Sequence, residues 1–219
     1  MNRMLVAIVI SFCSMNVGAQ DVFYSAKIKD SVIKSTTFQE NIIYLFCRGT
    51  YSKVGMVAKY FNLMDTVSTH VGIGYLRKGK LAIYNVTTNS NTNNAFKIES
   101  LEEFTSMDDI YSLQVWSIVL NKSDRRKVYG YCSRFSHKVI SFDYKFNTAN
   151  DDTLYCSEFC ANLLRYVNAT KFNFAPNSKD ISNTLFEVIL NKKELIYYPV
   201  DFFQSNPYFI RQASYIFKN

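Results

Sequence analysis

One cysteine of the chain lies where a thiol can act as a nucleophile. It follows the polar residues 147–152 and begins a series with the i, i+3, i+4, i+7 spacing of one helical face: Cys156, Phe159, Cys160, Leu163, Leu164 and Val167. In the first turn of a helix, free backbone N–H groups and the helix dipole lower the pKa of a thiol. The alternative is that Cys156 only begins a buried face, because free cysteine packs like a small apolar side chain.

A histidine that could serve as the base for this thiol lies on a predicted strand. Period-two alternation in residues 69–75 places Val71, Ile73 and Tyr75 on one face and His70, Gly72 and Gly74 on the other. Two glycines beside a histidine leave room for the close approach of a helix end or a ligand. The alternative for His70 is an ordinary strand histidine with a local hydrogen bond.

Asn85 is the candidate third member of this group. Residues 81–87 form a second strand, joined to the first through a turn at residues 77–80 that contains Gly79. An even-numbered turn pairs residue 72 with residue 85, which puts Asn85 on the face of His70 as a diagonal neighbour. A three-residue turn with a bulge would move Asn85 to the opposite face.

Zinc binding is a competing interpretation of the same residues. Cys156 and Cys160 share a helix face and could join His70 and His137 as four ligands. Two cysteines four residues apart in one helix are not a usual zinc spacing, however, and Cys160 belongs to an apolar face. His137, between Ser136 and Lys138 at a helix end, is interpreted as a cation favoured by the helix C-terminus. We therefore expect no metal and no cofactor.

Length and charge limit the other classes of function. With 219 residues and 48% hydrophobic content, the chain predicts one globular domain over residues 20–219. Lys and Arg number 25 against 18 Asp and Glu, a net charge of +7, but no run of five or six basic residues occurs. This pattern argues against a nucleic-acid-binding arm and is compatible with an acidic polymer or membrane surface as neighbour.

The N-terminus, residues 1–19, has the pattern of a secretory signal peptide. Arg3 is followed by an apolar stretch and by Val17-Gly18-Ala19, a small-residue cleavage site before Gln20. The apolar stretch is too short for a stable transmembrane anchor. We therefore expect a secreted or periplasmic protein of the cell envelope. Cleavage leaves four cysteines, and a Cys47–Cys132 disulfide is one open pairing, since it spares the Cys156 helix.

The remaining patterns predict an α+β fold in which helices pack on an antiparallel sheet. We expect a leading helix or arm over residues 21–38, and a helix capped by Ser123. The other expected strands are residues 41–47, 110–120 and 196–198, and the other expected helices are residues 54–61, 100–104 and 181–190.

Several of these segments together resemble the YiiX/YaeF-like permuted papain-fold family, over roughly residues 40–210. The resemblance rests on residues 69–73 (Thr-His-Val-Gly-Ile), Asn85, residues 100–104 (Ser-Leu-Glu-Glu-Phe), residues 142–146 (Phe-Asp-Tyr-Lys-Phe), residues 155–159 (Tyr-Cys-Ser-Glu-Phe) and residues 198–203 (Tyr-Pro-Val-Asp-Phe-Phe). The family is similar to NlpC-type cell-wall peptidases but circularly permuted, so the histidine precedes the cysteine. Its third catalytic residue is usually acidic, whereas this chain has Asn85, and residues 198–203 match its closing strand segment.

The resemblance implies a cysteine hydrolase that cleaves amide or peptide bonds through a thioester. Cys156 would be the nucleophile, His70 the base and Asn85 the residue that orients His70. Tyr155, Ser157 and Gly72 are candidates for oxyanion or substrate contacts. Peptidoglycan stem peptides are the expected substrate class. A lipid acyltransferase or thioesterase with the same Cys–His pair, and a non-catalytic binding module of the envelope, remain open; an apolar cleft favours the lipid substrate and a polar cleft the peptide.

Overall fold

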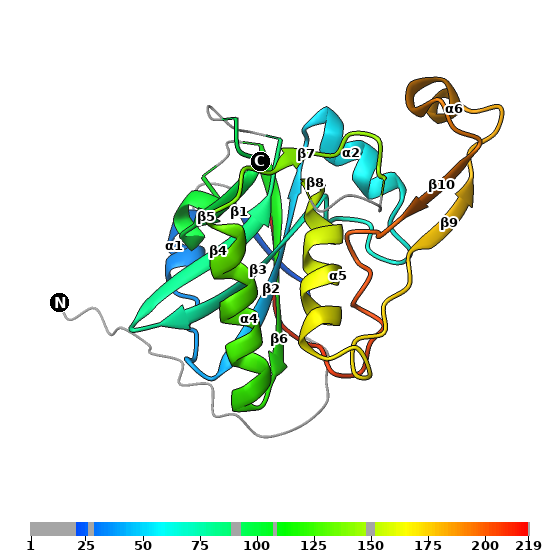
Figure 1. The fold of residues 1–219 in the computed structure, drawn as a ribbon. Coiled ribbons are helices and arrows are strands. Elements are labelled where there is room, and N and C mark those ends of the chain that lie inside the picture. Colours follow the sequence, from blue (N-terminus) through cyan, green and yellow to red (C-terminus); the bar gives the residue numbers. More distant parts are fainter. Residues whose placement is uncertain (1–20, 26–28, 89–92, 107–108, 148–151, 219) are drawn as a thin grey trace.

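The protein is described by a computed structural model that covers residues 21–25, 29–88, 93–106, 109–147 and 152–218 (Figure 1). The expected signal peptide, residues 1–19, lies outside the described residues. The four cysteines that the structure describes are all free thiols, so Cys47 and Cys132 are not joined. None of the helices described is long and apolar enough to cross a membrane.

A seven-stranded sheet forms the centre of the fold, in the order β1-β11-β6-β2-β3-β4-β5. The strands are β1 (Val22–Ser25), β2 (Ile42–Thr50), β3 (His70–Arg77), β4 (Lys80–Val86), β5 (Phe96–Glu99), β6 (Ile110–Val119) and β11 (Ile210–Lys218). Neighbouring strands are antiparallel, except that β1 runs parallel to β11. The fold is thus mixed α+β with a mostly antiparallel sheet, as the sequence patterns predict.

Helices cover both faces of this sheet (Figure 1). On one face α4 (Lys122–Phe135) and α5 (Cys156–Val167) pack over Val71, Ile73 and Tyr75, the apolar residues of β3. On the other face lie α1 (Lys29–Lys34) and α3 (Leu101–Phe104), over a second apolar cluster that contains Phe46 and Phe104. The short α2 (Lys53–Tyr60) follows β2. Burial of both faces explains why β2 reads as a continuous apolar run.

The β3–β4 hairpin has the even-numbered turn that the sequence predicts. Leu76 pairs with Leu81, and Arg77 pairs with Lys80, so the turn contains only two residues. Those residues, Lys78 and Gly79, have φ angles of 52° and 74°. Two positive φ angles give the type I′ turn that suits the twist of a hairpin. The same register places His70 and Asn85 on one face.

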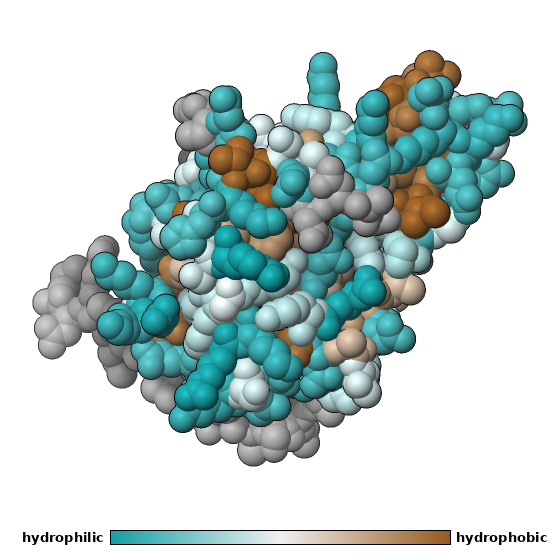
Figure 2. Space-filling model, viewed as in Figure 1, coloured by the Kyte–Doolittle hydropathy of each residue, from teal (hydrophilic) through white to brown (hydrophobic). Residues whose placement is uncertain are grey.

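A projecting arm consists of β9 (Asn177–Asp180), α6 (Leu185–Leu190) and β10 (Glu194–Tyr197), apart from the main sheet (Figure 1). Apolar side chains gather on the arm in Figure 2, and three of them, Leu185, Val188 and Ile189, are exposed on α6. A two-stranded parallel pair, β7 (Ser141–Phe142) with β8 (Thr153–Leu154), precedes α5.

The structure differs from the sequence-based expectations in several details. Residues 21–38 contain the expected helix, α1, but also the strand β1, and no strand was expected where β11 lies. Residues 198–203, expected as a closing strand segment, form no strand, and residues 200–203 are in turns. The cap of α4 is Asn121, whose side chain accepts a hydrogen bond from the N–H of Asp124. Asn121 replaces Ser123 in this role because the helix begins at Lys122, one residue before the expected cap.

Candidate active site

Cys156 is the first residue of α5, as its spacing predicts. The preceding residue, Tyr155, is the N-cap with extended backbone, and its side chain makes no capping hydrogen bond. The first-turn N–H groups of α5 are therefore not used by a cap side chain, which leaves donors beside the thiol. Cys156 is 6% exposed, whereas Cys47, Cys132 and Cys160 are fully buried.

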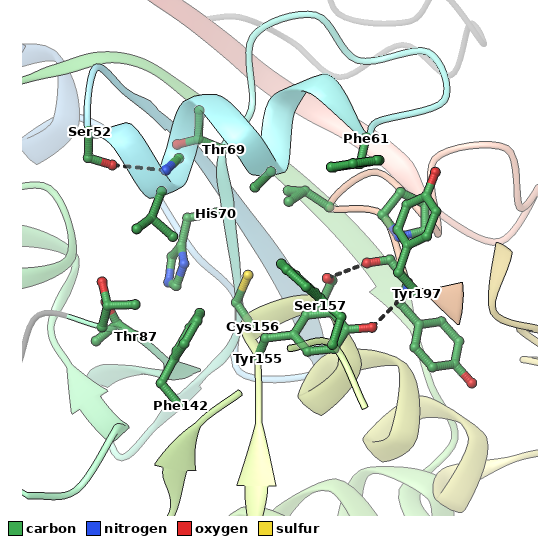
Figure 3. A pocket seen from close by; sticks show the side chains of 18 of the residues that line it. Ser52, Phe61, Thr69, His70, Thr87, Phe142, Tyr155, Cys156, Ser157 and Tyr197 are labelled. Atoms are coloured by element: carbon green, nitrogen blue, oxygen red, sulfur yellow. Dashed lines mark hydrogen bonds between the residues drawn. The ribbon is translucent and has the colours of Figure 1, made fainter. Parts of the chain in front are cut away.

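The two neighbours of Cys156 hold a distant segment in place. The backbone N–H of Tyr198 donates to the hydroxyl of Tyr155 at 2.8 Å, and the hydroxyl of Ser157 donates to the carbonyl of Tyr198 at 2.7 Å (Figure 3). The backbone N–H and carbonyl groups of Tyr198 are thus both hydrogen-bonded to the residues on either side of Cys156. Tyr155 and Ser157 therefore position a wall of the site, a structural task that the sequence interpretation did not foresee.

A buried carboxylate fixes the same wall from the other side. Asp201 accepts hydrogen bonds from the backbone N–H groups of Leu63, Met64 and Asp65, with the contact to Asp65 at 2.9 Å. Three N–H donors satisfy a buried carboxylate that would otherwise be costly to desolvate. Residues 198–201 are therefore tied both to the start of α5 and to the loop after α2.

His70 and Asn85 meet as the hairpin register predicts. Nε2 of His70 lies 2.9 Å from Oδ1 of Asn85, and both side chains are buried. The His70 ring also packs against the ring of Phe104 in α3, with centroids 5.7 Å apart. The hydrogen bond and the ring contact together fix the orientation of the imidazole, and the second ring nitrogen, Nδ1, is left for another partner.

Gly72 allows this arrangement because it has no side chain. A Cβ atom on Gly72 would lie 2.9 Å from Cγ2 of Ile83, 3.1 Å from Cβ of Asn85 and 3.3 Å from Phe104. The open space inferred from the glycines is thus occupied by Asn85 and by the end of α3. Gly72 is a packing position beneath the site, and no substrate contact is assigned to it.

His70 and Cys156 point into one cleft, the first from β3 and the second from the start of α5 (Figure 3). The cleft holds about 830 Å³ of unoccupied space, its open mouth included. Its walls are mainly apolar, with Phe61, Phe142, Phe146, Tyr155, Leu195 and Tyr197 among them. A smaller group of hydroxyls, Thr50, Ser52 and Thr69, lies at the N-terminal end of α2.

Burial governs the protonation of both groups. It raises the pKa of the Cys156 thiol, although the N–H groups of Val71 and Ser157 and the charge of Arg48 act in the opposite direction. Burial likewise lowers the pKa of His70 to about 3, and the Arg48 charge adds to this effect. The expectation of a lowered thiol pKa was therefore wrong, and both pKa shifts favour a neutral thiol and a neutral imidazole.

Two charged residues at the site were missed by the sequence interpretation. Arg48 of β2 pairs with His70 across the sheet, lines the cleft and is 5% exposed. Its guanidinium lies over the ring of Phe104 and donates to the Phe104 carbonyl. Glu99 of β5 accepts a hydrogen bond from Nδ2 of Asn85 at 2.8 Å. The available signals were a charged residue directly after the apolar run of β2 and a charged residue at the end of β5.

The ligands of the alternative zinc site do not come together. His137 is exposed just after α4, while Cys160 is on the face of α5 that is buried in the apolar core. Within the part of the chain that the structure describes, no group of three or more His, Cys, Asp or Glu side chains could hold a metal ion.

Comparison with known proteins gives a structural relative but no relative by sequence. No family model and no curated protein sequence matches the chain. The crystal structure of the metalloprotein yiiX from Escherichia coli O157:H7 is similar, with a TM-score of 0.56 and 14% sequence identity. The superposition covers 80% of this chain and 98% of that protein. At this identity, the likeness concerns the fold: the chain has a YiiX-like fold.

Proposed function

We propose that this protein is a cysteine hydrolase that cleaves an amide bond through a thioester on Cys156. The observation that carries the proposal is the position of three groups: a thiol at a helix start, an imidazole in the same cleft, and an amide that orients the imidazole. A nucleophile, a base and an orienting group within one cleft are the components of covalent acyl transfer. The YiiX-like fold and the order of His70 before Cys156 support a permuted papain-like arrangement.

The first half of the reaction forms the thioester. Nδ1 of His70 takes the proton of the Cys156 thiol while the sulfur attacks the substrate carbonyl carbon. The carbonyl oxygen becomes an oxyanion, which the Cys156 N–H in the first turn of α5 stabilises. Collapse of the tetrahedral intermediate breaks the C–N bond, and the proton on His70 passes to the leaving amine.

The second half releases the acid. His70 takes a proton from water, and the resulting hydroxide attacks the thioester carbonyl. The C–S bond breaks, and the proton returns from His70 to the sulfur. Asn85 keeps its hydrogen bond to Nε2 throughout, so the ring stays oriented as it gains and loses a proton at Nδ1.

A second candidate substrate class follows from the walls of the cleft. The aromatic and aliphatic lining described above suits an acyl chain better than a charged stem peptide. The same chemistry on an ester or thioester of a fatty acid makes the protein a thioesterase or lipid acyltransferase. Peptidoglycan stem peptides remain the amide substrate of the first candidate, because we also propose export to the cell envelope from the pattern of residues 1–19.

The similar structure is that of a metalloprotein, which raises the question of a metal in this cleft. The donor set argues against such a site, because Nε2 of His70 is bonded to Asn85 and the described residues bring no cluster of ligands together. The proposed mechanism therefore uses only side chains and backbone groups of the chain.

Two substrate series distinguish the candidates. p-Nitrophenyl esters of increasing acyl length test the acyl-chain cleft, and peptide p-nitroanilides test the amidase. A kcat/KM that rises with acyl length indicates the lipid substrate, whereas turnover of the anilides indicates the amidase. Cys156→Ala is the control in both series. Turnover that survives in this variant, or no turnover of either series, would contradict the proposed hydrolase.

A further inference from the structure

We propose that Glu99 is a positioning residue that sets the amide of Asn85 and, through it, the tautomer of His70. This inference rests on the proposed function of His70 as base, and it concerns a residue outside the expected catalytic group. Glu99 ends β5, one strand beyond Asn85, and accepts its hydrogen bond from Nδ2 of Asn85.

Four polar residues form a row across four neighbouring strands. Arg48 of β2 lies opposite His70 of β3, His70 bonds to Asn85 of β4, and Asn85 bonds to Glu99 of β5. The two hydrogen bonds are 2.9 Å and 2.8 Å long. Asn85 is fully buried, so both ends of its amide need partners within the protein.

Glu99 determines which group donates and which accepts in each of these two hydrogen bonds. An ionised carboxylate can only accept, so the end of the Asn85 amide that faces it must be the NH₂ group. The carbonyl end then faces His70 and can only accept, which requires the proton of the neutral imidazole to be on Nε2. Nδ1 consequently carries the lone pair that the proposed mechanism needs to take the Cys156 proton.

Glu99 also brings a negative charge into this row of residues, next to Asn85. An amide can orient an imidazolium but cannot neutralise it, and the buried Arg48 guanidinium opposes the positive charge on His70. The Glu99 carboxylate stabilises the charged form of Arg48 across the same row and polarises the Asn85 amide towards His70.

The experiment reads the tautomer directly. The chain has two histidines, so a His137→Gln background leaves His70 as the single signal in a ¹⁵N-histidine NMR spectrum. At pH 7 we expect His70 to be protonated at Nε2 and unprotonated at Nδ1. Glu99→Lys places a donor beside Asn85. The Asn85 side-chain amide should therefore rotate to present its oxygen to the lysine, and the His70 proton should move to Nδ1. Glu99→Ala removes the acceptor and should give both tautomers.

Kinetics of the same variants give the second readout. We expect kcat to fall about 100-fold or more in Glu99→Lys and about 10-fold in Glu99→Ala, with KM little changed, because the wrong tautomer cannot accept the thiol proton. Glu99→Gln, whose carbonyl can still accept from Asn85, should keep the Nε2–H tautomer and most of the activity. Glu102→Lys, an equal change of charge at the exposed start of α3, is the matched control and should behave like wild type.

The outcomes separate the two proposals. An Nε2–H tautomer and wild-type kcat in both Glu99→Ala and Glu99→Lys would overturn the role of Glu99. A tautomer that moves as expected in a protein without hydrolase activity would support the role of Glu99 and contradict the proposed function instead.

Discussion

Oδ1 of Asn85 lies 2.9 Å from Nε2 of His70, on two antiparallel strands that are joined by a two-residue turn. The turn fixes which side chains of β4 share a face with His70, because a slip of one residue would reverse every side chain of the strand. Orientation of the imidazole is therefore determined by the hairpin register, with the ring of Phe104 as the second contact.

Removal of the orienting amide should slow the chemistry more than it weakens binding. For Asn85→Ala we expect kcat to fall about 10- to 100-fold with KM nearly unchanged, or about 1.4–2.7 kcal/mol of transition-state stabilisation. Steady-state kinetics with a substrate that the wild type hydrolyses measure both constants. An unchanged kcat would reduce the catalytic group to Cys156 and His70.

Gly72 and Gly130 form a matched pair of glycine positions. Gly72→Ala should destabilise the protein by about 1–3 kcal/mol, since the added methyl group meets Ile83, Asn85 and Phe104 in a packed core. Gly130→Ala should stabilise it by about 0.5–1 kcal/mol, because Gly130 is in the middle of α4 with nothing near its missing Cβ. Urea denaturation measures both. Similar effects at the two positions would show that Gly72 is not in close contact.

The low pKa of His70 predicts acid sensitivity of the fold. The unfolded chain binds a proton on this histidine below its ordinary pKa of 6.5, whereas the folded protein does so only below about 3. As the pH falls from 6.5 towards 3, the unfolded state therefore gains protons and the free energy of unfolding decreases; above 6.5 this contribution is constant.

Measurement of the free energy of unfolding at several pH values can isolate the contribution of His70. Between pH 7.5 and 5.5, wild type should lose about 1.4 kcal/mol more unfolding free energy than His70→Gln. His137→Gln is the control, because His137 is exposed, and should follow wild type. Denaturation curves at several pH values give the comparison. Parallel loss of stability in wild type and His70→Gln would show that His70 has an ordinary pKa in the folded state.

The residues found from sequence were those that local patterns identify. Cys156 was placed by helical periodicity, and His70 and Asn85 by strand alternation together with a turn that contains glycine. Glu99 was missed because β5 has only four residues, too few for a period-two pattern. The capping box at Ser100 indicates only the helix that follows, α3. Arg48 was missed because it directly follows the apolar run of β2.

Protonation was not predictable in the same way. The sequence places Cys156 beside helix N–H donors, which lower the pKa of a thiol, and the structure contains that effect. Burial of the thiol outweighs this effect. One wall of the cleft is the segment around Tyr198, which is about forty residues further along the chain and is held in place by Tyr155 and Ser157. Long-range packing of this kind has no periodic signal in the sequence.

The most direct test of the account is formation of a covalent acyl-enzyme. The protein is mixed with p-nitrophenyl acetate or octanoate, quenched with acid within milliseconds to seconds, and analysed by peptide mass spectrometry. We expect one acyl group, located on Cys156, with much slower acylation in His70→Ala and none in Cys156→Ala. Cys47, Cys132 and Cys160 should stay unmodified in the folded protein, since they are fully buried. Acylation spread over the four cysteines, or an equal rate in His70→Ala, would contradict Cys156 as a nucleophile activated by His70.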